Sequence, residues 1–358
     1  MSDTEPKGQP VPELPKPKSP TAAGLVPWLV AAAIAGGAAA LKPQLPDSDY
    51  VPSPSVLALV AGMIIGAVPG VRAKLGAGVK KVSKQAIPYA VVAIGFSLEF
   101  GEFIRSGEAL SGLIIVLCAM SSAFAGALFF GRLFGLNPRA SMLLGAGTAV
   151  CGNSAIMAVV PTVEPSDEDL GLSIGVINLL GVVMVFALPP LAIAFGVDGA
   201  RGGALAGLTV HAVPQSFSTG EVFGDAGLDK ATLYKLVRVA MLVPVVVILS
   251  LVLAQIRGAK TSGKRAGIPI FVILFVLAAG ARAAGLVDSI IEIGETAKPL
   301  WEWAKVLGKF VLAMALAAIG IGLDVRTLVR VGPRMLIVGI AAVGLMVAVT
   351  LPLVRTML

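Results

Sequence analysis

Charged residues are scarce in this chain of 358 residues: they form 14% of it, whereas 56% is hydrophobic. Soluble domains carry roughly 25% charged residues. A soluble core cannot bury an apolar excess of this size, so we expect most of the chain to lie in a bilayer. This excludes a secreted disulfide scaffold, a nucleic-acid binder and an ordinary cytosolic enzyme.

Cysteine and histidine are almost absent, with only Cys118, Cys151 and His211. They are too few for a structural zinc site of Cys and His ligands, and we expect no metal, no cofactor and no disulfide. A GxxxxGK[ST] phosphate-binding motif is also missing from the sequence. This excludes an ATP-driven pump unless a partner supplies the ATPase.

Two regions differ in composition. Residues 1–20 hold six prolines and almost no apolar run, which predicts a disordered cytoplasmic tail. Residues 21–358 are predicted to form one transmembrane transporter domain of the all-α class, with about eleven transmembrane helices. The eleven apolar segments are 22–41, 55–70, 86–98, 110–130, 141–161, 171–196, 202–219, 231–256, 267–284, 303–323 and 335–355.

The charges between these segments predict an orientation. If all eleven span and the N-terminus is cytoplasmic, the inside segments carry 18 Lys and Arg and the outside segments carry 5. This bias follows the positive-inside rule. If 202–219 were only re-entrant, the basic segment 257–267 would move outside. We therefore favour eleven spans, a cytoplasmic N-terminus and a periplasmic C-terminus, while the full span of 202–219 stays open.

An internal repeat relates two segments. Residues 93–107 align without gaps to 318–332, with six identical positions among fifteen. The two segments are predicted to cross in opposite directions. This indicates inverted-topology repeats, which many secondary transporters have.

Two apolar segments are interrupted by small and polar residues near their middles. Gly152 can unwind the first helix, and Asn153 or Ser154 can cap a new half-helix that runs outward. In 202–219, Pro214 suits the first turn of another half-helix. Both half-helices would aim free N–H groups at the bilayer centre, where they would bind an anion. The alternative is close helix packing through small residues.

Acidic residues are missing from the predicted mid-membrane region, since all 21 lie in the tail or the loops. Four basic residues lie near the starts of segments 231–256 and 303–323, which are both predicted to begin on the outer side. For Lys235 and Lys305, snorkelling to the headgroups is the favoured interpretation. Arg238 and Lys309 fit snorkelling and an anion site equally well. His211 could act as a proton carrier, as an anion ligand or as a neutral hydrogen-bonded group. Asn178 is expected to form an interhelical hydrogen bond.

At these residues the sequence resembles the bacterial YeiH-like family, which is named for proposed sulfate export. GAGTAVCGNSAIMAV (145–159) resembles its GAGTSICGASAI motif, and the segments 209–215, 231–246 and 309–328 resemble three further blocks in the same order. The family's motif residues fall on Thr148, Cys151, Gly152, Ser154, His211, Gln215, Lys235, Arg238 and Lys309. The resemblance implies an inner-membrane transporter of the wider cation:proton antiporter and anion transporter grouping. This chain departs from the family's pattern at Asn153, Ala212 and Pro214.

Together these observations predict a secondary transporter of a small anion, of the sulfur oxyanion or organosulfonate class, in the bacterial inner membrane. It would work by alternating access, with proton coupling and a homodimer as open options. The expected substrate-binding residues are Thr148, Cys151, Gly152, Asn153, Ser154, His211, Gln215, Arg238 and Lys309. A cation/proton antiporter and a passive anion channel are the alternatives. A membrane-embedded enzyme is disfavoured because the sequence shows no nucleophile–base pair and no metal cluster.

Overall fold

A computed structural model describes residues 24–45, 52–98, 107–257, 270–293, 296–323 and 332–358. The predicted tail 1–20 therefore lies outside the described residues. The elements are α1 (Val26–Leu41), η2 (Lys42–Gln44), α2 (Pro54–Ala67), α3 (Val71–Gly95), α5 (Glu108–Leu133), α6 (Pro138–Ala149), α7 (Asn153–Val163), α8 (Asp167–Ala194), α9 (Gly199–Thr209), α10 (Val213–Val222), α11 (Gly224–Ala240), α12 (Leu242–Arg257), α13 (Ile270–Ala283), β1 (Ile290–Ile293), β2 (Thr296–Pro299), α14 (Leu300–Gly322) and α16 (Pro333–Met357). The predicted all-α membrane class is confirmed, and the one described sheet is the antiparallel β1–β2 hairpin.

Several helices are long and apolar enough to cross a bilayer. Six candidate spans satisfy both criteria: Val26–Gln44, Glu108–Leu133, Asp167–Ala194, Gly224–Leu253, Leu300–Gly322 and Pro333–Met357. The sequence also places helix starts clearly, because the Ser53 and Ser166 hydroxyls accept backbone N–H bonds at the starts of α2 and α8. Three acidic residues then occupy the first turn of α8, where the helix dipole favours them.

Segment 141–161 does not cross the bundle. It forms a helical hairpin, α6 with α7, that begins and ends at one place. Asn137, just before α6, donates from Nδ2 to Asp169 Oδ2 at 2.9 Å, and Asp169 lies in the first turn of α8, which follows α7. We call this end of the bundle, where α5 stops and α6 starts, the Asn137 end. Half-helix α7 therefore runs back toward the Asn137 end, so the expected outward direction is wrong.

Segment 202–219 forms a second hairpin, α9 with α10, at the opposite end of α8. Ser216 Oγ on α10 donates to the Ala206 carbonyl on α9 at 3.1 Å. A Cβ placed on Gly202 would lie 2.5 Å from the Phe223 ring, so the start of α9 meets the end of α10. We call this end, where α8 stops and α9 starts, the Gly199 end.

These two hairpins change the predicted topology without changing the orientation of later elements. Segments 141–161 and 202–219 each fold into a helical hairpin, so the structure does not confirm the expected count of about eleven full spans. Only the two segments between the hairpins lie at a different end of the bundle from the one predicted. Segment 162–170 lies at the Asn137 end, and segment 197–203, with Arg201, lies at the Gly199 end. Accordingly α8 runs parallel to α16, with Ser173 Oγ 3.8 Å from Met335 Sδ near the starts of both helices. The chain thus starts α1 at the Asn137 end and finishes α16 at the Gly199 end. Which end faces the cytoplasm stays a prediction.

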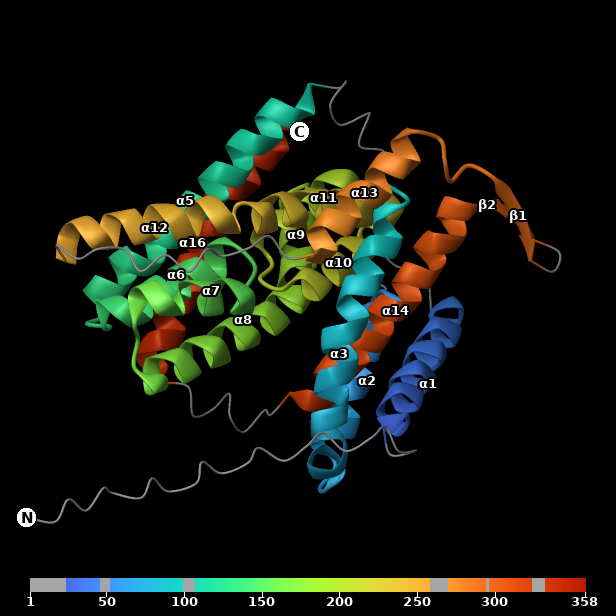
Figure 1. The fold of residues 1–358 in the computed structure, drawn as a ribbon, viewed down its shortest axis with the longest axis horizontal. Helices are drawn as coiled ribbons and strands as arrows, with labels where there is room; N and C mark the ends of the chain where they lie inside the picture. Colours follow the sequence, from blue (N-terminus) through green and yellow to red (C-terminus); the bar gives the residue numbers. More distant parts are fainter. Residues whose placement is uncertain (1–23, 46–51, 99–106, 258–269, 294–295, 324–331) are drawn as a thin grey trace, which may run out of the picture.

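Helices α1, α2, α3 and α14 stand side by side as a separate panel (Figure 1). Glycine lets α2 and α14 approach closely, since a Cβ on Gly62 would lie 2.3 Å from the Ala317 carbonyl oxygen. Helices α3 and α14 run antiparallel, because Gly308 meets Ile94 while Gly322 meets Val79. The described parts of the repeat, 93–98 and 318–323, lie at the ends of these two helices. They have the opposed directions that an inverted repeat requires, and most of the remaining repeat lies outside the described residues.

Candidate functional site

The two hairpins are broken by short non-helical tips, and both predicted helix breaks are confirmed. Tip 1, residues 150–152, separates α6 from α7, and its Gly152 has φ 74° and ψ −128°. This backbone conformation is unfavourable for residues with a Cβ. The Gly152 N–H donates to the Gly147 carbonyl at 2.9 Å and so closes the end of α6. Glycine is therefore required here for backbone geometry.

Tip 2, residues 210–212, separates α9 from α10. Pro214 lies in the first turn of α10, as the sequence predicted. The Gln215 side chain turns back to the tip, where its Oε1 accepts from the Ala212 N–H at 3.3 Å. Gly181 of α8 makes room for Gln215, since a Cβ there would lie 2.1 Å from Gln215 Oε1. Gln215 therefore stabilises the tip as well as lying at the start of a half-helix.

The two tips meet at the middle of the bundle. A Cβ placed on Gly152 would lie 3.8 Å from the His211 carbonyl carbon and oxygen, and 3.4 Å from Ile177 on α8. The meeting point is therefore a contact of backbone with backbone. Because the hairpins enter from opposite ends, it lies at the innermost point of both.

Lys235 of α11 joins the two tips. Its Nζ donates to the Val150 carbonyl of tip 1 at 3.0 Å, to the Val210 carbonyl of tip 2 at 2.8 Å, and to the His211 carbonyl. These bonds use all three donors of an ammonium group. The side chain is 0% exposed, so the expectation that Lys235 snorkels to the headgroups is wrong.

Arg238, one turn further along α11, binds the ends of α6 and α9 from the same side. Its Nη2 donates to Thr148 O at 2.6 Å, its Nε to Ala149 O at 3.0 Å, and its Nη1 to Gly207 O at 3.1 Å and Val210 O at 3.3 Å. Carbonyls at a helix C-terminus have no intrahelical partner and carry partial negative charge. The two cations therefore satisfy the C-terminal ends of two half-helices that stop inside the protein.

The N-termini of α7 and α10 lie at the same tips. Asn153 opens α7, and its Nδ2 donates to Asn178 Oδ1 on α8 at 2.7 Å, which confirms the interhelical bond expected of Asn178. Within the described residues, four buried polar groups near the tips lack a hydrogen-bond partner: Thr148 Oγ1, Asn153 Oδ1, and His211 Nδ1 and Nε2. Buried polar groups normally have a partner. The tips therefore offer unused donors and acceptors beside two helix N-termini.

The structure brings most of the predicted binding residues together. At or beside the tips lie Thr148, Cys151, Gly152, Asn153, Ser154, His211, Gln215 and Arg238. Ser154 is exposed while its neighbours Cys151 and Gly152 are buried. Lys309 is not part of the group, because it lies at the Gly199 end in an ion pair with Asp225. Beside it, Lys305 Nζ lies 3.0 Å from Asp229 Oδ2.

Sequence reasoning missed two charged residues. The expected binding set does not include Lys235, although its spacing of three from Arg238 places both cations on one face of α11. Glu221 was assigned to an outside loop, but it lies on α10 and is 8% exposed. Its carboxyl group lies near Ser53 and Ser55, where α10 packs against α2. A carboxylate is therefore buried at the contact between the second hairpin and the panel of α1, α2, α3 and α14.

No group of three or more His, Cys, Asp and Glu side chains that could hold a metal ion occurs in the described ranges. Cys118 on α5 and Cys151 in tip 1 are free thiols. The unused polar groups at the tips are thus nitrogen and oxygen atoms suited to hydrogen bonds.

Comparison with known proteins places the chain in a family. The family described as conserved hypothetical protein 698 matches residues 27–339. The UPF0324 membrane protein blr3189 of Bradyrhizobium diazoefficiens is 33% identical over 342 residues, covering 93% of each chain. The UPF0324 inner membrane protein YeiH of Escherichia coli is 29% identical over 291 residues, covering 79% of this chain and 80% of its own length. No solved structure matches. The chain therefore belongs to the UPF0324 family of membrane proteins, the conserved hypothetical protein 698 family.

Proposed function

We propose that this protein is a secondary transporter of a small anion across the bacterial inner membrane. One observation carries the proposal: two helical hairpins enter from opposite ends and place the N-termini of α7 and α10 at one buried point. Half-helix N-termini at mid-membrane are the ion and substrate sites of several transporter folds. The atoms of Asn153, His211 and Thr148 at that point that have no hydrogen-bond partner among the described residues support a bound ligand.

The charges at the tips favour an anion over a cation. Lys235 and Arg238 are both 0% exposed and lie directly behind the tips. They satisfy the carbonyl ends of α6 and α9, so the negative ends of the half-dipoles are offset while the positive ends of α7 and α10 remain. A helix N-terminus with this surrounding charge binds oxyanions through its backbone N–H groups. The sulfur oxyanion and organosulfonate class follows from the family resemblance.

The hairpin arrangement also suits alternating access. The start of α6 and the end of α7 lie at the Asn137 end, while the start of α9 and the end of α10 lie at the Gly199 end. A substrate at the tips is therefore separated from each side by a different hairpin. Movement of one hairpin or of the helices beside it would open the site to one side at a time.

The first test is ligand binding by the purified protein in detergent. Sulfite, sulfate, taurine, isethionate, acetate and sodium are added separately at pH 6 and pH 8, and the melting temperature is recorded. A ligand that binds only the folded state raises this temperature. We expect a rise with a sulfur oxyanion or a sulfonate, and its loss in Ser154→Ala. Ser111→Ala, on α5, is the matched control. A rise with sodium alone would contradict the anion assignment.

The second test is transport in proteoliposomes with the anion identified in the first. In a carrier, unlabelled anion inside the vesicles accelerates the uptake of labelled anion from outside by exchange. In a channel, the internal anion does not accelerate this uptake. We expect exchange in the wild type and its loss in Ser154→Ala and His211→Ala, with the proteins still in the membrane. Fast uptake without acceleration by internal anion would favour the passive channel.

A cation/proton antiporter remains the second candidate because of Glu221. The absence of carboxylates from the predicted mid-membrane region argues against it, but Glu221 is a buried carboxylate near the end of α10, and its Oε2 has no hydrogen-bond partner within the described residues. Proteoliposomes with an acidic interior and a pH-sensitive dye test this alternative. Alkalinisation of the interior on addition of sodium or potassium, absent in Glu221→Gln, would establish the antiporter. The same variant leaves anion exchange intact if Glu221 has no part in anion binding.

A further inference from the structure

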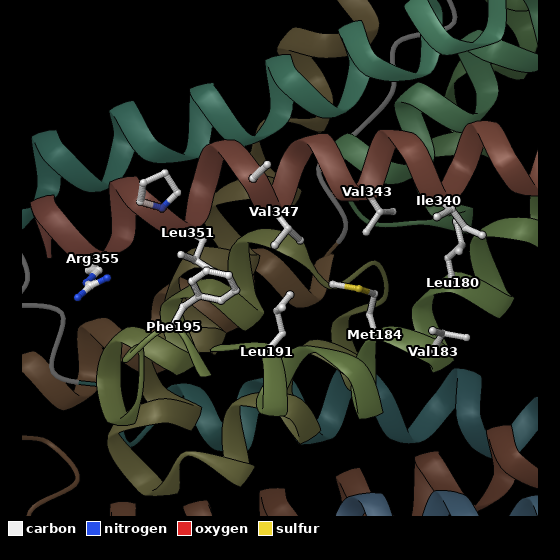
Figure 2. A pocket seen from close by; sticks show the side chains of 13 residues that line it. Leu180, Val183, Met184, Leu191, Phe195, Ile340, Val343, Val347, Leu351 and Arg355 are labelled. Carbon is white, nitrogen blue, oxygen red and sulfur yellow. The ribbon is translucent and has the colours of Figure 1, made fainter. Parts of the chain in front are cut away.

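An apolar groove of about 720 Å³ runs along the bundle between α8 and α16 (Figure 2). Its walls are apolar side chains of α8 from Leu180 to Leu191, Phe195 just after the end of α8, and apolar side chains of α16 from Ile340 to Leu351. Several of these side chains are largely exposed, including Phe195 at 51% and Ile340 at 54%. The groove is therefore open toward the surroundings of the bundle, where a membrane-spanning protein meets lipid.

Small residues of α16 create the space. Gly344 and Ala348 line the groove one turn apart, each next to a larger residue, Val343 and Val347. A Cβ placed on Gly344 would meet no atom within 4 Å. A larger side chain at this position would therefore enter the groove instead of colliding with a neighbouring helix.

Arg355 is the one charged side chain among the described residues that line the groove. It lies in the last turn of α16, at the Gly199 end, and its guanidinium group is at one end of the row of apolar side chains (Figure 2). No described acidic side chain forms an ion pair with it. The groove thus combines a long apolar wall with one cation at its end.

The length of the groove matches one leaflet of a bilayer. Ile340 and Arg355 are separated by fifteen residues of α16, which corresponds to about 22 Å along a helix. Half of a bilayer, with the polar headgroup region included, is about 20–22 Å thick. An acyl chain whose phosphate lies beside Arg355 therefore fits along the wall toward Ile340.

From this arrangement we infer that the groove binds one acyl chain of an anionic phospholipid, with the lipid phosphate on Arg355. The apolar wall alone gives little preference, because the surrounding lipid tails are as apolar as the groove. Preference for this lipid comes from the guanidinium group, which binds phosphate oxygens through paired N–H donors. By the orientation predicted from the charges, the lipid belongs to the outer leaflet of the inner membrane.

Native mass spectrometry of the purified chain tests the inference. The protein is delipidated and then given equal amounts of palmitoyl-oleoyl phosphatidylglycerol and phosphatidylcholine. We expect the wild type to retain phosphatidylglycerol about fivefold over phosphatidylcholine, as one basic residue near anionic lipid provides. Arg355→Gln should remove this preference, and Gly344→Leu should reduce retention of both lipids by filling the groove.

Two matched controls keep the test specific. Arg334→Gln removes an exposed cation from the opposite end of α16, and Gly171→Leu adds a side chain at an open glycine of α8 outside the groove. Both should bind lipid as the wild type does. Equal retention of the two lipids by the wild type, or an unchanged preference in Arg355→Gln, would overturn the inference. So would a lipid-free dimer that Gly344→Leu converts to a monomer, because a second copy would then cover the groove.

Discussion

Lys235 of α11 donates a hydrogen bond to the main-chain carbonyl of His211, the central residue of tip 2. Through its other two donors the same ammonium group binds Val150 and Val210. A single side chain therefore holds together two hairpins that enter from opposite ends of the bundle.

Replacement of Lys235 by Met should strongly destabilise the fold. The variant removes the donor of the buried Val150 and His211 carbonyls and leaves Val210 only its bond from Arg238, and an unsatisfied buried polar group costs about 1–3 kcal/mol. We expect a clear fall in melting temperature in detergent. Lys230→Met on the same helix is the control, because Lys230 pairs with Glu108 in a partly exposed ion pair and such pairs contribute about 0–1 kcal/mol. Equal effects of the two substitutions would contradict the role of Lys235.

Gly152→Ala should impair the site through the backbone. With φ at 74° and ψ at −128°, a Cβ introduces strain of about 1–3 kcal/mol. Either tip 1 shifts or the protein loses this stability, and in both cases we expect weaker ligand binding in the melting assay. Gly171→Ala, in an open helical position, should leave the melting temperature unchanged or raise it slightly. Full ligand response in Gly152→Ala would show that the tip tolerates another geometry.

Accessibility of single cysteines should distinguish the two hairpins from two full spans. In a background without Cys118 and Cys151, Glu164→Cys should react with an impermeant maleimide from the same side as Arg139→Cys. Arg201→Cys should react from the same side as Glu292→Cys. These four positions are exposed. Eleven full spans require the reverse result for Glu164 and Arg201, so labelling of spheroplasts and inverted vesicles decides between the topologies.

The bond between Asn153 and Asn178 should be measurable as a coupling energy. A double-mutant cycle with Asn153→Ala and Asn178→Ala compares the single and double losses of stability. Residues in direct hydrogen bonding typically couple by about 0.5–3 kcal/mol. We expect a value in this range from chemical unfolding in detergent micelles. Additive effects would mean that the amide of Asn153 is held by other groups.

The sequence predicted the helix breaks because their causes are local. Gly152 removes a Cβ where the backbone needs a positive φ, and Pro214 fixes the first turn of a half-helix. The direction of the half-helices had no such local cause. A hairpin of two short helices and one spanning helix have similar lengths and similar apolar content, as segments 141–161 and 202–219 demonstrate.

The charge rule could not reveal the error either. When two re-entrant segments replace two spans, every later loop lies on the same side of the membrane as in the eleven-span topology. Between them, 162–170 contains no Lys or Arg and 197–203 contains only Arg201. The distribution of basic residues is therefore almost the same in both topologies. The burial of Lys235 and Glu221 was beyond the sequence for a different reason, since it depends on which helices pack around α11 and α10.

The shared ammonium group of Lys235 also constrains how the bundle can change shape. If the tips moved apart, the carbonyl groups of at least one tip would lose their donor inside the membrane. A rotation of either hairpin about its tip preserves these bonds while the far ends of its helices swing. In the proposed transport cycle we therefore expect the smallest displacements around the Lys235 ammonium group and the largest at the two surfaces of the membrane.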